Sequence, residues 1–113
     1  DVKDWRKMDK QAEEYKRLKE NYPEEILFYQ VGIFYKVMFE DARKIADIAG
    51  LKLMVSGEVS NPIEVCGFPK SGLDKYVGKL LRKDFSVAIC NQVQDGKGQI
   101  RREVSEVVRS KKL

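Results

Sequence analysis

The segment from Ile26 to Phe39 constrains the fold of this 113-residue chain more than any other. It is rich in β-branched and aromatic residues, and Gly32 interrupts it near the middle. Residues of these types favour extended structure, whereas an isolated glycine marks a break in it. We therefore predict two strands, Ile26 to Val31 and Ile33 to Phe39, that meet at Gly32.

Three other segments have the periodicity of amphipathic helices. The first covers about residues 4–21 and ends before Pro23, and its apolar residues recur every three or four positions. They are Trp5, Met8, Ala12, Tyr15, Leu18 and Tyr22. The second covers 41–49, with Gly50 as its C-terminal cap, and the third begins near Ser71 and ends near Lys83.

The remaining apolar segments predict further strands. Residues 51–55 alternate like a half-buried strand, 63–66 resume extended structure, and 85–91 have the continuous apolar character of a central strand. Residues 100–108 fit both helical spacing and alternation, and we favour a strand followed by a frayed tail at 109–112. The pattern predicts an α/β chain of the α+β type, with a mixed sheet of five to six strands and three flanking helices.

The composition is that of one ordinary globular domain covering 1–113, because 42% of residues are apolar and 35% are charged. No apolar run reaches the length of a membrane-spanning helix, and the N-terminus lacks the layout of a secretory signal. We expect a cytoplasmic protein that does not bind membranes. Whether the chain is a fragment of a larger protein or stands alone is open at this point.

Several classes of chemistry lack the residues they require. The chain has no histidine, no Walker-type phosphate loop and no dinucleotide-binding glycine motif. We therefore expect no catalytic site, no metal site and no cofactor. Cys66 and Cys90 lie in apolar runs, which favours buried free thiols, although a disulfide between the two runs is the alternative.

A candidate binding pair lies in the second strand of the Ile26–Phe39 segment. Side chains alternate across a strand, so Ile33, Tyr35, Val37 and Phe39 are predicted to form the core face, and Phe34, Lys36 and Met38 the other. An aromatic ring beside a cation suits insertion into a weakened base step of nucleic acid. The net charge of +4, from 22 basic and 18 acidic residues, permits such a partner without proving it. Periodicity alone favours a plainer reading, in which Phe34 packs under the first helix and Lys36 is solvated.

Several motifs resemble those of the bacterial MutS family. The run Leu27 to Ala42, LFYQVGIFYKVMFEDA, resembles a strand leading into that family's G-x-F-Y-E motif and an acidic helix start. Gly67-Phe68-Pro69 resembles its G-x-P, and Val87 to Gln92, VAICNQ, resembles its V-A-I-C-E-Q strand. Tyr15-x-x-Leu18-Lys19, followed by Tyr22-Pro23-Glu24, is similar to its first helix and exit. The similarity covers about residues 8–108 in one order.

The resemblance implies the fold and role of the family's N-terminal mismatch-recognition domain, domain I. In that family the matching phenylalanine, here Phe34, stacks on a mispaired base from the minor groove. The implied partner is double-stranded DNA with mismatches or small loops. The family's clamp, lever and ATPase domains lie outside the similarity, so no enzyme activity is expected here, and the isolated domain is expected to be monomeric although full-length members are dimeric.

One functional position departs from the family pattern, because Lys36 stands where the motif has glutamate. An ammonium group only donates hydrogen bonds and attracts any nearby phosphate, so base specificity is in doubt. The DNA-binding hypothesis assigns stacking to Phe34, a phosphate or base contact to Lys36, and close approach of the backbone to Gly32. The alternative is a scaffold domain that has lost mismatch sensing and binds a protein. A buried Phe34 ring would favour the scaffold, and an exposed ring beside an unpaired Lys36 would favour DNA.

Overall fold

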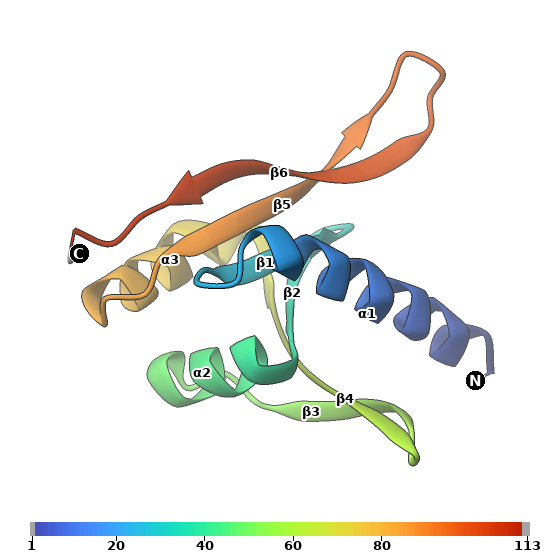
Figure 1. Ribbon diagram of the computed structural model, residues 1–113, viewed down its shortest axis with the longest axis horizontal. Coiled ribbons are helices and arrows are strands. Elements are labelled where there is room, and N and C mark those ends of the chain that lie inside the picture. The colour runs from blue at the N-terminus through green and yellow to red at the C-terminus, as the bar shows by residue number, and fades with distance from the viewer. Residues whose placement is uncertain (1, 112–113) are drawn as a thin grey trace.

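The computed structural model describes residues 2–111, and the side chains of residues 8–111. Along the chain the elements are α1 (Val2–Asn21), β1 (Ile26–Val31), β2 (Phe34–Met38), α2 (Phe39–Ala49), β3 (Met54–Glu58), β4 (Asn61–Pro69), the 3-10 turn η1 (Lys70–Gly72), α3 (Leu73–Arg82), β5 (Val87–Gln94) and β6 (Ile100–Val108). Figure 1 shows their arrangement, with β5 and β6 forming a long hairpin that extends beyond the rest of the chain.

The strands form one mixed sheet in the order β3-β4-β2-β1-β5-β6. β1 pairs in parallel with β5, from Ile26 opposite Val87 to Tyr29 opposite Cys90, whereas the other neighbours are antiparallel. The predicted α+β fold with a mixed sheet and three α-helices is therefore confirmed for residues 2–111. The strand predicted for 100–108 is confirmed as well, since β6 has these bounds.

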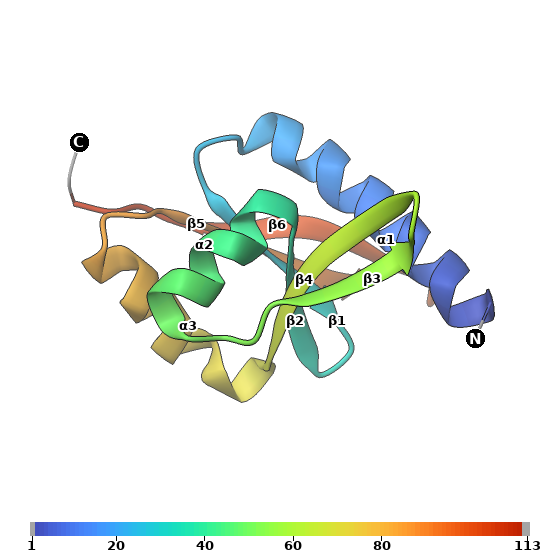
Figure 2. The same ribbon diagram turned by 90° about the horizontal axis from the view of Figure 1, so that it is seen from below.

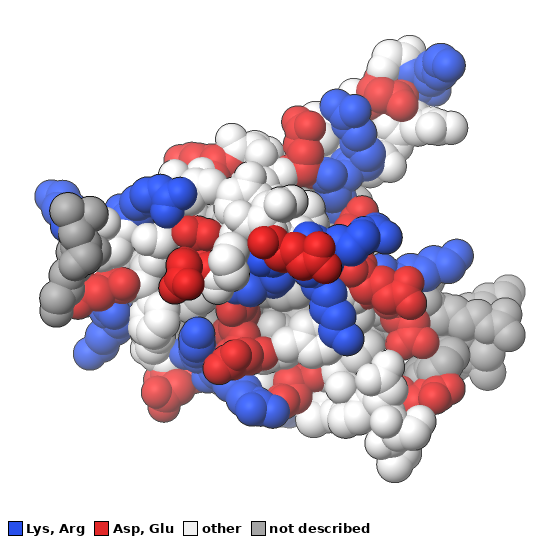
Figure 3. Space-filling view, in the orientation of Figure 1, with Lys and Arg blue, Asp and Glu red and all other residues white. Residues whose placement is uncertain are grey.

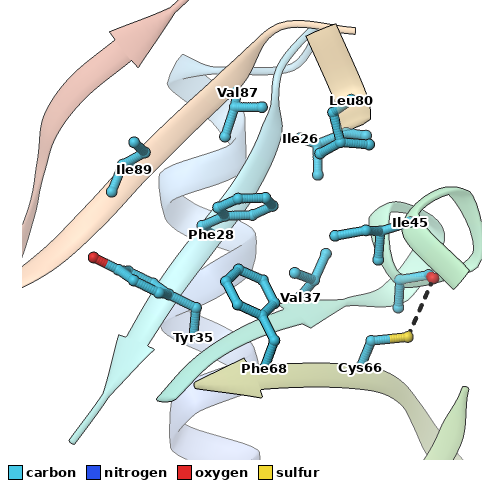
Figure 4. Close-up of a cluster of buried hydrophobic side chains, with 11 residues drawn as sticks. Ile26, Phe28, Tyr35, Val37, Ile45, Cys66, Phe68, Leu80, Val87 and Ile89 are labelled. Atoms are coloured by element: carbon cyan, nitrogen blue, oxygen red, sulfur yellow. Dashed lines mark hydrogen bonds between the residues drawn. The ribbon is translucent and has the colours of Figure 1, made fainter. Parts of the chain in front are cut away.

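Helices cover both faces of the sheet (Figure 2). On one face, α2 and α3 cover a cluster in which Phe28, Tyr35 and Phe68 pack ring against ring (Figure 4). On the other face, α1 contributes Ala12 and Tyr15 to a second cluster. The predicted α1 stripe is confirmed for Met8, Ala12, Tyr15, Leu18 and Tyr22, and Trp5 lies outside the described side chains.

A buried carboxylate joins three elements near the C-terminal end of α1. Asp41 in α2 is only 4% exposed, and its Oδ2 accepts a hydrogen bond from the backbone N–H of Leu27 at 3.0 Å. The hydroxyl oxygen of Tyr15 lies 2.8 Å from the same Oδ2, and Lys19 Nζ lies 3.2 Å from Asp41 Oδ1. These bonds fix α1 against β1 and the start of α2.

The start and end of the second predicted strand were wrong. Ile33 was assigned to the core face, but β2 begins at Phe34, and Ile33 lies in the preceding turn with 72% of its surface exposed. Phe39 was assigned to the same face, but it begins α2 with a left-handed φ of 58°. Tyr35 and Val37 are buried on the predicted core face. Met38, predicted on the other face, is buried as well, because that face packs against α1 there. Short-range alternation therefore holds inside the strand and fails where the chain turns.

The third strand is displaced along the chain from its predicted position. We predicted strand at 51–55, but β3 covers Met54–Glu58 and pairs with β4 in a hairpin. β3 is an edge strand with Met54 and Val55 both exposed, so its burial does not alternate.

The tail at Arg109 and Ser110 is not frayed, because Arg109 forms an ion pair with Glu25 and the Ser110 N–H donates to Ser86 Oγ. Lys112 lies outside the described residues.

Candidate nucleic-acid interface

The turn between β1 and β2 presents the predicted binding pair. Val31 and Phe34 are paired across the two strands, so only Gly32 and Ile33 form the turn. Gly32 has φ +61°, whereas Ile33 is not in the left-handed region. This arrangement is expected of a type II′ hairpin, which requires glycine at its first central position. A Cβ at Gly32 would have nothing within 4 Å, so conformation and not space demands glycine here.

Phe34 and Lys36 lie on the same face of β2 and line one groove of about 510 Å³ on the α1 side of the sheet. The groove is mainly apolar, and its other lining residues include Met8, Val31, Met54, Val55 and Val65. Phe34 is 46% exposed, so it neither stands free in solvent nor packs in the core. The prediction that Phe34 and Lys36 share a face is confirmed.

Lys36 is half-buried and has an uncharged partner. Its Nζ donates to Gln11 Oε1 in α1 at 3.1 Å. Burial, and next the nearby Arg102, lower the pKa of Lys36. Among the described side chains no carboxylate forms an ion pair with Lys36. The Lys36 ammonium therefore has a hydrogen-bond partner, Gln11, but no described carboxylate neutralises its charge.

Other cations near the groove differ in how far they are committed to protein partners. Lys52 is exposed and lines the groove itself. Arg102 is occupied, because its Nε donates to the Gln30 carbonyl at 2.7 Å and its guanidinium lies 4.5 Å from the centre of the Tyr29 ring. Among the described side chains on the face in Figure 3, basic and acidic residues are interspersed and form no continuous basic surface. Electrostatic attraction for DNA would be local and not spread over this face.

Two glutamines beside the turn were missed in the sequence. The side chain of Gln30 donates to the Gly32 carbonyl at 2.9 Å and accepts from the Gln92 N–H at 2.7 Å. The Gln92 side chain accepts from the Gly32 N–H at 3.0 Å. Two signals were available: Gln30 is a polar residue within an otherwise apolar strand, and both glutamines lie in the runs that resemble family motifs.

The remaining candidate chemistry is structural. Cys66 and Cys90 are buried free thiols, as predicted, and burial raises the pKa of the Cys90 thiol to about 12. Among the described side chains, those of residues 8–111, no cluster of three or more is suited to bind a metal ion. None of the described helices is long and apolar enough to cross a membrane.

Comparison with known proteins identifies relatives that contain the same segment. A family model described as MutS domain I matches residues 10–110. The chain is 38% identical over 98 residues to the DNA mismatch repair protein MutS of Chlorobium limicola. The matched segment is 84% of this chain and 11% of that relative. The chain is 39% identical over 105 residues to the MutS of Desulfovibrio desulfuricans, covering 89% and 11%. The MutS of Lawsonia intracellularis is 37% identical over 102 residues, covering 87% and 11%. The chain thus spans about a tenth of the length of these relatives.

Proposed function

Because this chain belongs to the MutS domain I family, we propose that it contacts mispaired or looped duplex DNA and that Phe34 is the residue that stacks on the exposed base. The observation that carries the proposal is the half-exposed Phe34 ring at the edge of a groove that also holds an unneutralised ammonium. The relatives are named as DNA mismatch repair proteins, and the chain matches about a tenth of the length of each.

The energetics of stacking favour distorted DNA over perfect duplex. Stacking of a base on an aromatic ring contributes about 1–3 kcal/mol, and opening a base step costs a similar few kcal/mol. A mismatched or looped step is already partly open, so opening it costs less. The balance then favours insertion of Phe34 at such a step and disfavours it elsewhere.

Lys36 adds a contact that does not depend on base identity. Its Nζ is held near the groove by Gln11, where a phosphate or a base acceptor could replace that amide. A lysine in place of the family's glutamate should raise affinity for any duplex and reduce discrimination between lesions. We expect the isolated chain to bind weakly, because one domain neutralises few phosphates.

The first experiment titrates the protein with a duplex carrying one unpaired nucleotide and with the matching homoduplex. Phe34→Ala should weaken binding to the looped duplex by about 5-fold to 150-fold, the loss of one stacked base, and leave homoduplex binding nearly unchanged. Phe34→Trp should retain the preference because it keeps an aromatic face, whereas Phe34→Leu should not.

Ile33→Ala is the matched control, since Ile33 is an exposed apolar residue next to Phe34 in the same turn. It should change neither titration. Equal binding of both duplexes by the wild type and by every variant would exclude a wedge and favour the scaffold alternative. If Ile33→Ala weakens binding to the looped duplex and Phe34→Ala does not, the inserted residue is Ile33 in the turn, which contradicts the proposal.

A further inference from the structure

The side chains of Gln30 and Gln92 form a clamp on the turn that precedes Phe34, and we propose that these two glutamines are positioning residues for the Phe34 ring. Gln30 is buried, with 8% of its surface exposed, and Gln92 is half-buried on β5. Three hydrogen bonds define the glutamine clamp, and each joins one of these side chains to Gly32 or to the other glutamine's strand.

The glutamine clamp begins where the regular sheet ends. The parallel ladder between β1 and β5 stops at Tyr29 and Cys90. Beyond that pair, the Gln30 side chain takes the place of a backbone partner, because its Oε1 accepts from the Gln92 N–H at 2.7 Å. The two strands therefore stay joined up to the level of Gly32 through side chains.

The clamp satisfies both backbone polar groups of Gly32. The N–H donates to Gln92 Oε1 at 3.0 Å, and the carbonyl accepts from Gln30 Nε2 at 2.9 Å. On the far side of the turn, the Ile33 carbonyl accepts from the Lys70 N–H at 2.8 Å. The turn is thus held from β5 on one side and from η1 on the other, although it lies at the surface.

Phe34 is the first residue after this turn, so the turn determines where its ring points. A change of one residue in turn length would shift the pairing of β1 with β2, and side chains of β2 would exchange faces. Phe34 would then leave the groove on the α1 side. By fixing the left-handed Gly32, the glutamine clamp restrains the ring before any ligand binds, which reduces the entropy lost on binding.

The two glutamines use different atoms, and this difference gives a specific test. At Gly32, Gln92 acts only as an acceptor, so Gln92→Glu retains the bond and Gln92→Leu loses it. Gln30 acts as donor and acceptor, so Gln30→Glu places a carboxylate oxygen against the Gly32 carbonyl oxygen. Glutamate should therefore substitute at position 92 and fail at position 30, a pattern that a general packing role would not produce.

The clamp itself is tested without DNA, by amide hydrogen exchange measured by NMR. Gln92→Leu should speed exchange of the Gly32 N–H by about threefold to tenfold, the range for loss of one net hydrogen bond. Gln92→Glu should leave that rate near the wild-type value. The matched control is Gln94→Leu on the same strand, whose amide donates to the Gly98 carbonyl and not to the turn. An unchanged Gly32 rate in Gln92→Leu would overturn the clamp.

Positioning of Phe34 rests on the proposed function and is tested by a double-mutant cycle. The probe is a duplex with one unpaired nucleotide beside 2-aminopurine, whose fluorescence reports unstacking. In the Phe34 background, Gln92→Leu should lower the preference for this duplex over homoduplex by about threefold to tenfold. In the Phe34→Ala background the same change should have less than about a twofold effect, the usual error of additivity.

The two experiments separate failure of the clamp from failure of the function. Equal effects of Gln92→Leu in both backgrounds would overturn positioning, even if Gly32 exchange accelerates. If the wild type does not prefer the looped duplex over homoduplex and Phe34→Ala changes neither affinity, the proposed function fails, and the positioning role fails with it. The hydrogen-exchange data still decide whether the clamp holds the turn.

Discussion

At Gly32, backbone conformation and not crowding by protein atoms disfavours a side chain. Its φ of +61° is a region that residues with a Cβ enter at a cost of about 1–2 kcal/mol, and no neighbouring atom lies near the space a Cβ would fill. Gly32→Ala should therefore lower the free energy of unfolding by about 1–2 kcal/mol. Urea denaturation followed by circular dichroism measures this change.

Gly96 is the matched control, because it also lies in a turn with nothing within 4 Å of a Cβ but lacks a positive φ. Gly96→Ala should leave stability unchanged or raise it slightly. Equal denaturation midpoints for wild type and Gly32→Ala would show that the left-handed turn is not maintained in solution.

Lys36 should determine how the protein divides its affinity between distorted and perfect DNA. Lys36→Glu should weaken binding to both duplexes and raise the ratio of looped-duplex to homoduplex affinity. If Lys36 contacts a phosphate, the slope of log affinity against log salt should decrease by about 0.9. Titrations at several salt concentrations measure both effects.

Lys75→Glu makes the same charge change on α3, which covers the opposite face of the sheet from the groove. It should leave the affinity ratio and the salt slope largely unchanged. A lower ratio in Lys36→Glu than in the wild type would contradict the view that lysine here reduces discrimination.

The candidate site was only partly accessible from sequence. Alternation correctly placed Phe34 and Lys36 on one face, because residues two apart in a strand must share a face. It failed at Ile33, where the two-residue turn breaks the alternation. Gln30 and Gln92 were missed because the two bonds that join β1 and its turn to β5 connect residues about sixty positions apart, and no local pattern encodes such a pairing.

Asp41 links α1, β1 and α2 through one buried carboxylate. Asp41→Ala would leave the Leu27 N–H without its carboxylate acceptor and remove the anion beside Lys19. Breaking such a part-buried network should lower the free energy of unfolding by roughly 2–4 kcal/mol. Asp47→Ala, at an exposed position of the same helix, should change it by less than about 0.5 kcal/mol. Similar denaturation midpoints for the two variants would show that the network contributes little.

Helices and central strands were predictable because their burial is one-sided or complete. α1 has one apolar stripe facing the sheet, and β5 begins with four buried residues in succession. β3 was misplaced because an edge strand with exposed Met54 and Val55 has no burial pattern to read. Its position follows from pairing with β4, which is a non-local property.

The protein as a whole should lose stability in alkaline solution. Burial raises the pKa of both cysteine thiols and of Tyr15, Tyr29 and Tyr35, with Cys90 raised from 9.0 to about 12. Below their unfolded-state pKa values these groups are neutral in both states, and their stabilising effect is fully present. As pH rises further, these groups ionise first in the unfolded chain, which stabilises the unfolded state. Each group then lowers the free energy of unfolding by up to about 1.4 kcal/mol per pH unit.

Lys36 opposes this trend because its pKa is lowered by folding, but it is one group against five. Urea denaturation at pH 8 and at pH 10.5 should therefore show a lower midpoint at the higher pH. Tyr29→Phe should reduce the difference by removing one of the raised groups. A midpoint that does not fall between these pH values would contradict the burial of these side chains.

The parallel pairing of β1 with β5 affects how the chain is made. β2 follows β1 directly, but the strand on the other side of β1 is synthesised about sixty residues later. A nascent chain on the ribosome therefore carries β1 with one open edge until β5 emerges, and an open strand edge is a template for aggregation. Fragments that end before Val87 should for this reason self-associate, however well their helices form.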